Sequence, residues 1–263
     1  MRRALLLLLA AAPLAATACG GGGGGGGGLP KPLARATHDR RDDRSGPKIH
    51  FVYAVPGGRP ELDRRRDVDR TLTNSIILLD LWFRSQKRSP RLRIDTYRGR
   101  PDITFVRLPR ENFAYDRAGP DALMRDVSRV IAPRPRKLYA VYYDGAPVES
   151  EPGICGLGRP GRHPFALVFL AQSCGYDYGT AADGGYNPLV FVMAHEVVHE
   201  LGFVSGCAPH SVGGGHVGDS RRDLMAPRLK PFTIPVLDVH GDDYYLAHNG
   251  CSDIGRSPYL TLP

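Results

Sequence analysis

The chain alternates between short apolar runs and turn residues from about residue 48 onward. Lys48–Val55 is rich in β-branched and aromatic residues and ends at Pro56-Gly57-Gly58, which predicts a first strand. Runs of the same kind predict four more strands, over Leu92–Tyr97, Ile103–Leu108, Lys137–Tyr143 and Ala166–Ala171. The glycine- and proline-rich stretch between the last two strands predicts an irregular loop that carries Cys155.

Apolar residues at helical spacing lie between and after these strands. Spacings of three and four between Asp63 and Gln86 predict one amphipathic helix. Its apolar face consists of Leu72, Ile76, Leu79 and Phe83. Further helices are predicted over Asp121–Ile131, from Asn187-Pro188 to Gly202, and briefly around Asp242–His248. The order of these elements predicts an α+β fold, a mixed β-sheet with packed helices and an irregular C-terminal subdomain.

The first 46 residues differ in composition from the rest. Arg2 and Arg3, followed by a short leucine and alanine run, predict an export signal over residues 1–18. Ala16-Thr17-Ala18-Cys19 resembles a bacterial lipobox, so Cys19 is a candidate lipid anchor to the cell membrane, on its extracytoplasmic face. Without that modification the exported chain is secreted. The glycine run 20–28 and the charged residues after it predict a disordered linker over 19–46, with the folded domain at 47–263.

Charge and cysteine content narrow the functional classes. The formal net charge is +8, but the arginines are scattered without a groove-like repeat, so we expect a solvated surface and no nucleic-acid partner. Apart from Cys19, four cysteines remain, an even number that predicts two disulfides in an exported chain. Three pairings are possible. Sequential pairing, Cys155–Cys174 and Cys207–Cys251, closes the shorter loops and is favoured. A monomer is expected by default.

The segment His195-Glu196-Val197-Val198-His199 carries the clearest chemistry. It falls in the helix that ends at Gly202, where histidines four residues apart leave one face and can share a metal ion. Glu196 lies beside the first ligand and can take a proton from a water on the metal. This arrangement is typical of a hydrolytic zinc centre. The alternative is a pair of surface histidines without a metal.

These residues give the chain a resemblance to a known family. His195, Glu196, His199 and Gly202 match in register the active-site helix of the metzincin group of zinc peptidases. Asp223-Leu224-Met225-Ala226-Pro227 resembles the methionine turn of that group, with Met225 as an apolar floor under the metal. Segments Cys207–His210 and Gly215–Val217 are also similar to exported actinobacterial lipoproteins of uncharacterised function. The resemblance implies a zincin-like fold and zinc as the cofactor.

The third metal ligand departs from the family pattern. Ser205 stands where the family has histidine or aspartate. His216 is favoured instead, because it lies nine residues before Met225, close to the separation in the matrix-metallopeptidase branch. His210 and Asp219 remain alternatives, and each of the three could otherwise serve only as a hydrogen-bonding loop residue.

The sequence thus predicts a zinc metallo-endopeptidase, with Glu196 as general base, acting on extracytoplasmic protein or peptide. Two alternatives stay open: a cell-surface binding module on the same fold, degenerate at the third ligand, and a hydrolase of cell-wall peptide. A serine hydrolase is disfavoured because no Gly-x-Ser-x-Gly segment occurs. Nucleotide binding is disfavoured because the glycine run lacks the lysine of a phosphate loop.

Overall fold

A computed structural model describes residues 35–58, 60–146, 154–159, 161, 164–171, 188–228 and 233–263. The predicted export signal, Cys19 and Cys174 lie outside these residues. No helix in the described part of the chain is long and apolar enough to cross a membrane.

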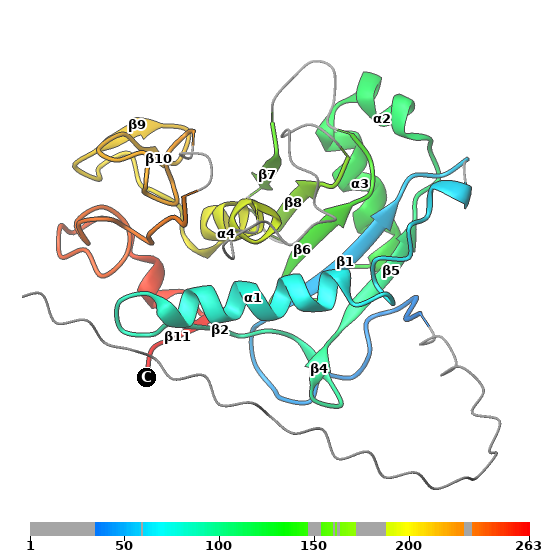
Figure 1. Cartoon of the computed structure of the whole chain (residues 1–263), viewed down its shortest axis with the longest axis horizontal. Helices are drawn as coiled ribbons and strands as arrows, with labels where there is room; N and C mark the ends of the chain where they lie inside the picture. Colours follow the sequence, from blue (N-terminus) through cyan, green and yellow to red (C-terminus); the bar gives the residue numbers. More distant parts are fainter. Residues whose placement is uncertain are drawn as a thin grey trace, which may run out of the picture. The chain divides into compact units, whose positions relative to one another are not determined.

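A five-stranded sheet forms the centre of the domain (Figure 1). Its strand order is β5 (Ile103–Arg107), β1 (Lys48–Val55), β6 (Lys137–Tyr143), β8 (Phe165–Phe169) and β7 (Gly156–Arg159). The first four run parallel, and β7 runs antiparallel to β8 at the edge. Every residue of β1, β6 and β8 is buried, as expected for parallel strands that are covered on both faces.

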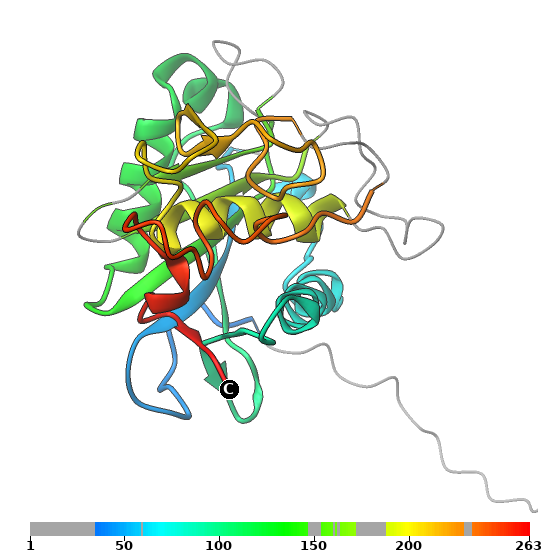
Figure 2. The same ribbon diagram turned by 90° about the vertical axis from the view of Figure 1, so that its left-hand side faces the viewer.

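Helices cover both faces of the sheet (Figure 2). On one face, α1 (Thr71–Ser85) and α4 (Pro188–Leu201) pack with the C-terminal segment against the odd-numbered residues of β1. On the other face, α3 (Pro120–Ile131) and Tyr115 of α2 (Asn112–Ala118) pack against Val52 and Ala54. Successive side chains of β1 therefore point to opposite faces of the sheet and contribute to both hydrophobic cores.

Short elements complete the described fold. β2 (Arg91–Leu92) pairs with β11 (Leu260–Thr261), and β3 (Thr96–Tyr97) pairs with β4 (Arg100–Pro101). After α4, a hairpin of β9 (Ser211–Gly213) and β10 (His216–Val217) leads into the C-terminal loops. Two 3-10 turns, η1 (Pro60–Leu62) and η3 (Ile254–Arg256), are the remaining elements.

The α+β fold class is confirmed, as are the predicted strands that became β1, β5, β6 and β8. Helix α1 begins at Thr71 and not near Asp63, because Arg65 and Arg70 have left-handed backbones that a helix cannot contain. The predicted strand over Leu92–Tyr97 is interrupted, because Asp95 is buried and its carboxylate binds His50 and Lys137. Helix α2 and strand β7 were not predicted.

The short helix predicted over Asp242–His248 does not form. The carboxylate of Asp238 instead accepts hydrogen bonds from five successive backbone N–H groups, those of residues 241–245. Backbone donors that converge on one carboxylate cannot donate along a helix axis. The prediction of a helix is therefore wrong, and the segment is a loop organised by Asp238.

The segment 35–46, predicted as part of a disordered linker, packs on the domain. Arg35 binds the carboxylates of Asp63 and Asp67, and Arg40 binds Asp102 through Nε at 2.7 Å. Nζ of the buried Lys137 donates to Asp39, Asp42 and Asp95 at 2.7, 2.8 and 2.7 Å. The prediction of a disordered linker is wrong for residues 35–46. Their arginines and aspartates suggested a solvated segment, but these side chains bind buried charged residues of the domain.

The predicted disulfide Cys207–Cys251 is present and joins the loop after α4 to the C-terminal loop. Cys155 is also disulfide-bonded, and the partner predicted for it, Cys174, lies outside the described residues. The two bonded residues Cys207 and Cys251 are 44 positions apart. In the chain-entropy treatment, a disulfide that closes a loop of that length raises the free energy of unfolding by about 4 kcal/mol, because it lowers the conformational entropy of the unfolded chain.

We therefore expect the double variant Cys207→Ser, Cys251→Ser to unfold with a free energy about 4 kcal/mol lower than that of the parent chain. Denaturant unfolding at fixed metal concentration measures the difference. A loss below about 1 kcal/mol, small against the chain-entropy value, would contradict the expectation.

Candidate metal centre

Helix α4 presents two histidines from an otherwise buried surface. Pro188 stands in its first turn, where a missing N–H costs nothing, and its apolar residues pack into the core beside α1 and β8. Only His195 and His199 of its residues are partly exposed. Because they are four apart, their rings leave the same face, with centroids 4.9 Å apart.

The hairpin after α4 brings a third histidine to this pair. Nε2 of His195 lies 3.2 Å from Nε2 of His216 and 3.2 Å from Nε2 of His199. Three nitrogens bound to one tetrahedral zinc ion at 2.0–2.1 Å stand about 3.3 Å apart. The spacing therefore fits a shared metal ion.

Hydrogen bonds orient the histidines so that Nε2 is free to bind a metal. Nδ1 of His195 donates to the carbonyl of Leu224 at 2.6 Å, which leaves the lone pair on Nε2. The ring of His216 is hydrogen-bonded to the backbone of Gly213. Burial lowers the pKa of His195 to about 4 and that of His199 to about 3, so both rings are neutral at pH 7, the form that binds metals.

The predicted methionine turn connects two of the three histidines. Leu224 in this turn accepts the hydrogen bond from His195, and the carbonyl of Met225 accepts from the N–H of Val217, next to His216. Met225 itself is fully buried. The turn thus fixes the orientation of His195 and the position of β10.

Asp223 holds the turn in place and was missed as a site residue. Its buried carboxylate accepts hydrogen bonds from the N–H groups of Met225 and Val239 and from the hydroxyl of Tyr244, at 2.7, 2.8 and 2.8 Å. An aspartate that accepts from the N–H two residues later is a common turn signal, so the sequence held a clue.

The carboxyl group of Glu196 lies between α4 and β7. Glu196 is 6% exposed, and a Cβ added at Gly156 would stand 2.5 Å from its Cγ and 2.7 Å from its Oε1. A Cβ at Gly158 would stand 2.5 Å from Cβ of His199. Glycines in β7 therefore let a strand backbone pass directly against the helix face that carries the motif. Burial, and secondly the charge of Glu200, raises the pKa of Glu196 well above its usual value.

Gly215, in the turn of the hairpin, is a second residue that the sequence did not identify. Its φ is +79°, and a Cβ there would stand 2.9 Å from Nδ1 of His199. Gly99, in the turn between β3 and β4, provides a matched control, because its φ is +74° and a Cβ there would meet nothing within 4 Å.

An alanine at position 215 would be strained by about 1–2 kcal/mol in the left-handed conformation, and its Cβ would also collide with His199. We therefore expect Gly215→Ala to weaken zinc binding by about tenfold or more. Gly99→Ala should share the strain and keep the zinc affinity. Competition with a chromophoric chelator measures both variants. Equal zinc affinities for the two variants would contradict the role given to Gly215.

His210 and Asp219, the alternative third ligands, do not join the three histidines. They lie with Asp243 in a separate cluster, whose ligand atoms are within 4.8 Å of one another. His216 is thus the residue that the structure brings to His195 and His199, and its role as a zinc ligand stays a prediction.

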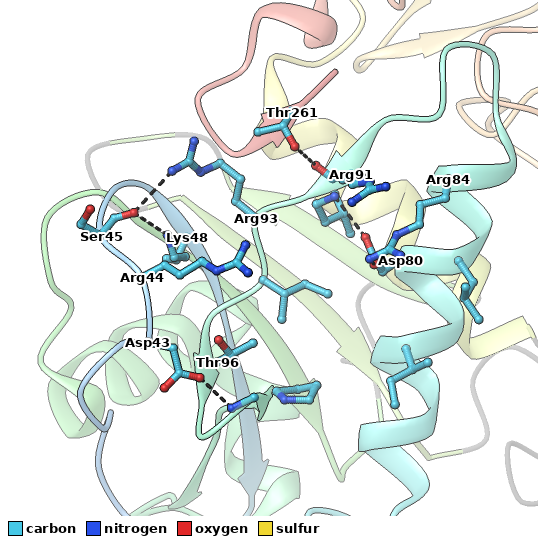
Figure 3. A pocket seen from close by; sticks show the side chains of 16 residues that line it. Asp43, Arg44, Ser45, Lys48, Asp80, Arg84, Arg91, Arg93, Thr96 and Thr261 are labelled. Atoms are coloured by element: carbon cyan, nitrogen blue, oxygen red, sulfur yellow. Dashed lines mark hydrogen bonds and ion pairs between the residues drawn. The ribbon is translucent and has the colours of Figure 1, made fainter. Parts of the chain in front are cut away.

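A cavity of about 760 Å³ elsewhere in the described part contains none of these residues (Figure 3). Its charged lining is mostly basic, with Arg44, Lys48, Arg84, Arg91 and Arg93 against Asp43 and Asp80. Nζ of Lys48 donates to the Ser45 carbonyl, and Arg84 pairs with Asp80. Without histidine, cysteine or glutamate, this cavity offers no comparable metal centre.

No protein-family model matches the chain, and no curated protein matches it. Among solved structures it is similar to OgpA from Akkermansia muciniphila, with 16% identity and a TM-score of 0.42 over 64% of this chain and 51% of OgpA. It is also similar to archaemetzincin from Methanopyrus kandleri, with 18% identity and a TM-score of 0.35 over 71% and 83%. A catalytically inactive OgpA in complex with an O-glycopeptide substrate matches with 15% identity and a TM-score of 0.35 over 64% and 50%.

The chain thus spans about half the length of OgpA.

Proposed function

We propose that this chain is a zinc-dependent endopeptidase that acts on extracytoplasmic protein or peptide. The observation that carries the proposal is the convergence of His195, His199 and His216, with Nε2 of His195 3.2 Å from Nε2 of each of the others. Three neutral imidazoles suit zinc, and three protein ligands are the number that zinc has in catalytic sites.

When bound, zinc supplies a Lewis acid that polarises the substrate carbonyl and lowers the pKa of a coordinated water to about 7. Glu196 accepts the proton of the attacking water and passes it to the leaving amine. A cation held by His195, His199 and His216 would favour the ionised carboxylate of Glu196, against the effect of burial on its pKa. The packing against β7 restricts the Glu196 side chain to the side of α4 that faces the sheet edge.

Strand β7 is suited to hold an extended substrate. It is the edge strand of the sheet in the described part of the chain, and its backbone passes beside Glu196 and His199. A peptide that adds to such an edge forms main-chain hydrogen bonds in extended form, and this places its carbonyls along the helix face. Cleavage within a chain, rather than at its end, is the expected outcome.

The cellular setting is also part of the proposal. The Cys207–Cys251 disulfide suits an oxidising compartment, in keeping with export and with the lipid anchor expected at Cys19. The partner is then a protein or peptide substrate outside the cytoplasm. No nucleic acid is involved, and the working unit is the monomer.

The test is cleavage of an unfolded protein and of peptidoglycan fragments, side by side, by the purified full chain. Cleavage of the protein that stops on chelation and returns with zinc supports the proposal. Cleavage of peptidoglycan alone would replace it with a cell-wall hydrolase. If neither is cleaved although zinc is bound, the chain is a binding module.

A further inference from the structure

The base of the hairpin that carries His216 holds a second group of possible metal ligands. His210 precedes β9, Asp219 follows β10, and the N–H of Gly218 donates to the carbonyl of His210 at 2.9 Å. Asp243 reaches this point from the C-terminal loop, with Oδ2 3.1 Å from Nδ1 of His210. The ligand atoms of His210, Asp219 and Asp243 lie within 4.8 Å of one another.

Asp219 is the member that points to a missing partner. Its side chain is 8% exposed, and both carboxylate oxygens are buried without a hydrogen-bond donor. Burial of an ionised carboxylate in this state is strongly unfavourable. Oδ1 of Asp242, whose Oδ2 is 3.9 Å from Nδ1 of His210, likewise has no donor. Among the residues that the structure describes, no lysine or arginine forms an ion pair with Asp219, Asp242 or Asp243.

In two other acidic clusters of this chain, the buried carboxylates have hydrogen-bond donors. Asp39 and Asp95 surround His50, but Nζ of Lys137 lies among them and donates to both. Asp238 is buried beside Asp243, but its oxygens accept the backbone N–H groups of residues 241–245. Lys137 thus supplies the positive charge in the first group, and backbone amides satisfy the carboxylate in the second. In the cluster at the base of the hairpin, Asp243 accepts the N–H of His210 at 2.9 Å, but in the described part of the chain neither oxygen of Asp219 has a hydrogen-bond donor.

We propose that His210, Asp219 and Asp243 bind a second divalent cation, with Asp242 as a further ligand. Carboxylate oxygens accept most divalent ions, whereas an imidazole ligand favours a borderline ion such as Zn²⁺ over Ca²⁺. The cation neutralises the buried carboxylate of Asp219 and uses Nδ1 of His210 as its nitrogen ligand.

The position of this cation gives it a structural role. Ligands on both sides of the hairpin and on the C-terminal loop are held together at one point, near the Cys207–Cys251 disulfide in sequence. The cation thus fixes the base of the hairpin whose far end presents His216. It is independent of the reaction, since none of its ligands belongs to the three-histidine centre.

The test compares the full chain with Asp219→Asn, His216→Ala and the double variant. After equilibration with Zn²⁺ or Ca²⁺ and removal of free metal, bound metal is measured by elemental analysis. We expect two zinc ions per chain in the parent, one in each single variant and none in the double variant. Retention of calcium instead of zinc at the Asp219 site would support the site and correct the ion.

The melting temperature of Asp219→Asn is a second test. It is expected to change in opposite directions for a bound cation and for an unpaired carboxylate. If a cation is bound, the melting temperature of the variant in zinc falls below that of the parent. If Asp219 is merely an unpaired carboxylate, the amide leaves the melting temperature unchanged or raises it, and the proposal is overturned.

His240→Gln is the matched control for an ion pair in place of a cation. Nε2 of His240 is 3.6 Å from Asp219, and its side chain is 61% exposed. We expect this variant to keep two zinc ions. Metal content equal in the parent and in Asp219→Asn, with a stability loss in His240→Gln, would assign Asp219 to His240 and overturn the cation site. Because the His216→Ala variant reports on the other centre separately, failure of either site is recognised independently.

Discussion

Replacing Glu196 with glutamine is expected to lower kcat/KM for peptide hydrolysis by about 100- to 10,000-fold, the usual contribution of a general base. The amide has nearly the same shape, so it keeps the packing between α4 and β7, but it cannot accept the proton of the attacking water. The zinc content should stay unchanged, because Glu196 is not among the three converging histidines. Initial rates on an unfolded protein, with elemental analysis of the same samples, measure both quantities.

Glu200→Gln is the matched control for this variant. Glu200 is a second buried glutamate on α4, one turn further along, and its charge raises the pKa of Glu196. Its replacement makes the same chemical change on the same helix without removing the base, so we expect kcat/KM to stay within about tenfold of the parent value. Full activity of Glu196→Gln with zinc bound would contradict the mechanism. Loss of zinc from that variant would show that the carboxylate serves the metal and not the water.

The parts of the site that depend on local spacing could be predicted from the sequence. Histidines four apart on a helix must share a face, and Asn187-Pro188 and Gly202 marked the limits of that helix, although Asn187 lies outside the described residues. The β-branched strand Lys48–Val55 was predicted with its observed limits, because a central parallel strand is apolar on both faces. Local pattern and tertiary packing agree at these positions.

The third histidine of the centre depends on contacts between distant segments, which spacing alone does not give. His210, His216 and Asp219 lie in one glycine-rich stretch, and each has a side chain that can bind a metal. The hairpin β9–β10 separates them, because it directs His216 toward α4 and leaves His210 and Asp219 at its base. Strand β7 was missed for a related reason, since glycines that look like loop residues are there to let a backbone pass against α4.

The partners of charged groups also lie in distant segments, and local spacing did not predict them. Asp223 and residues 35–46 are the two examples. Composition predicts that an aspartate- and arginine-rich segment is solvated, yet partners from distant strands and loops bury these charges. In the methionine turn, Asp223 connects Met225, Val239 and Tyr244, which come from three separate parts of the C-terminal region. The irregular C-terminal region therefore holds its shape through buried carboxylates rather than through repeating secondary structure.

Replacing His216 with alanine is expected to raise the free zinc concentration that gives half-maximal peptidase activity by more than about 100-fold, or to prevent reactivation altogether. Loss of a hydrogen-bonding partner behind a ligand already costs about 10- to 100-fold in metal affinity, and loss of the ligand itself costs more. Activity, and not total metal, is the suitable readout, because it reports only the centre beside Glu196. The chelated protein is titrated with buffered zinc and assayed at each point.

His210→Ala separates the two assignments of the third ligand. His210 lies with Asp219 and Asp243 at the base of the hairpin, so its loss can disturb the zinc centre only through the position of β10. His210 hydrogen-bonds none of the three histidines in the described part of the chain, so we expect the zinc concentration for half-maximal activity to stay within about tenfold of the parent value, below the usual cost of losing a partner behind a ligand. The reverse result, with His210→Ala inactive and His216→Ala restored by ordinary zinc, would require the loop 205–219 to rearrange when metal binds. The hairpin would then be a mobile element of the site and not a fixed part of it.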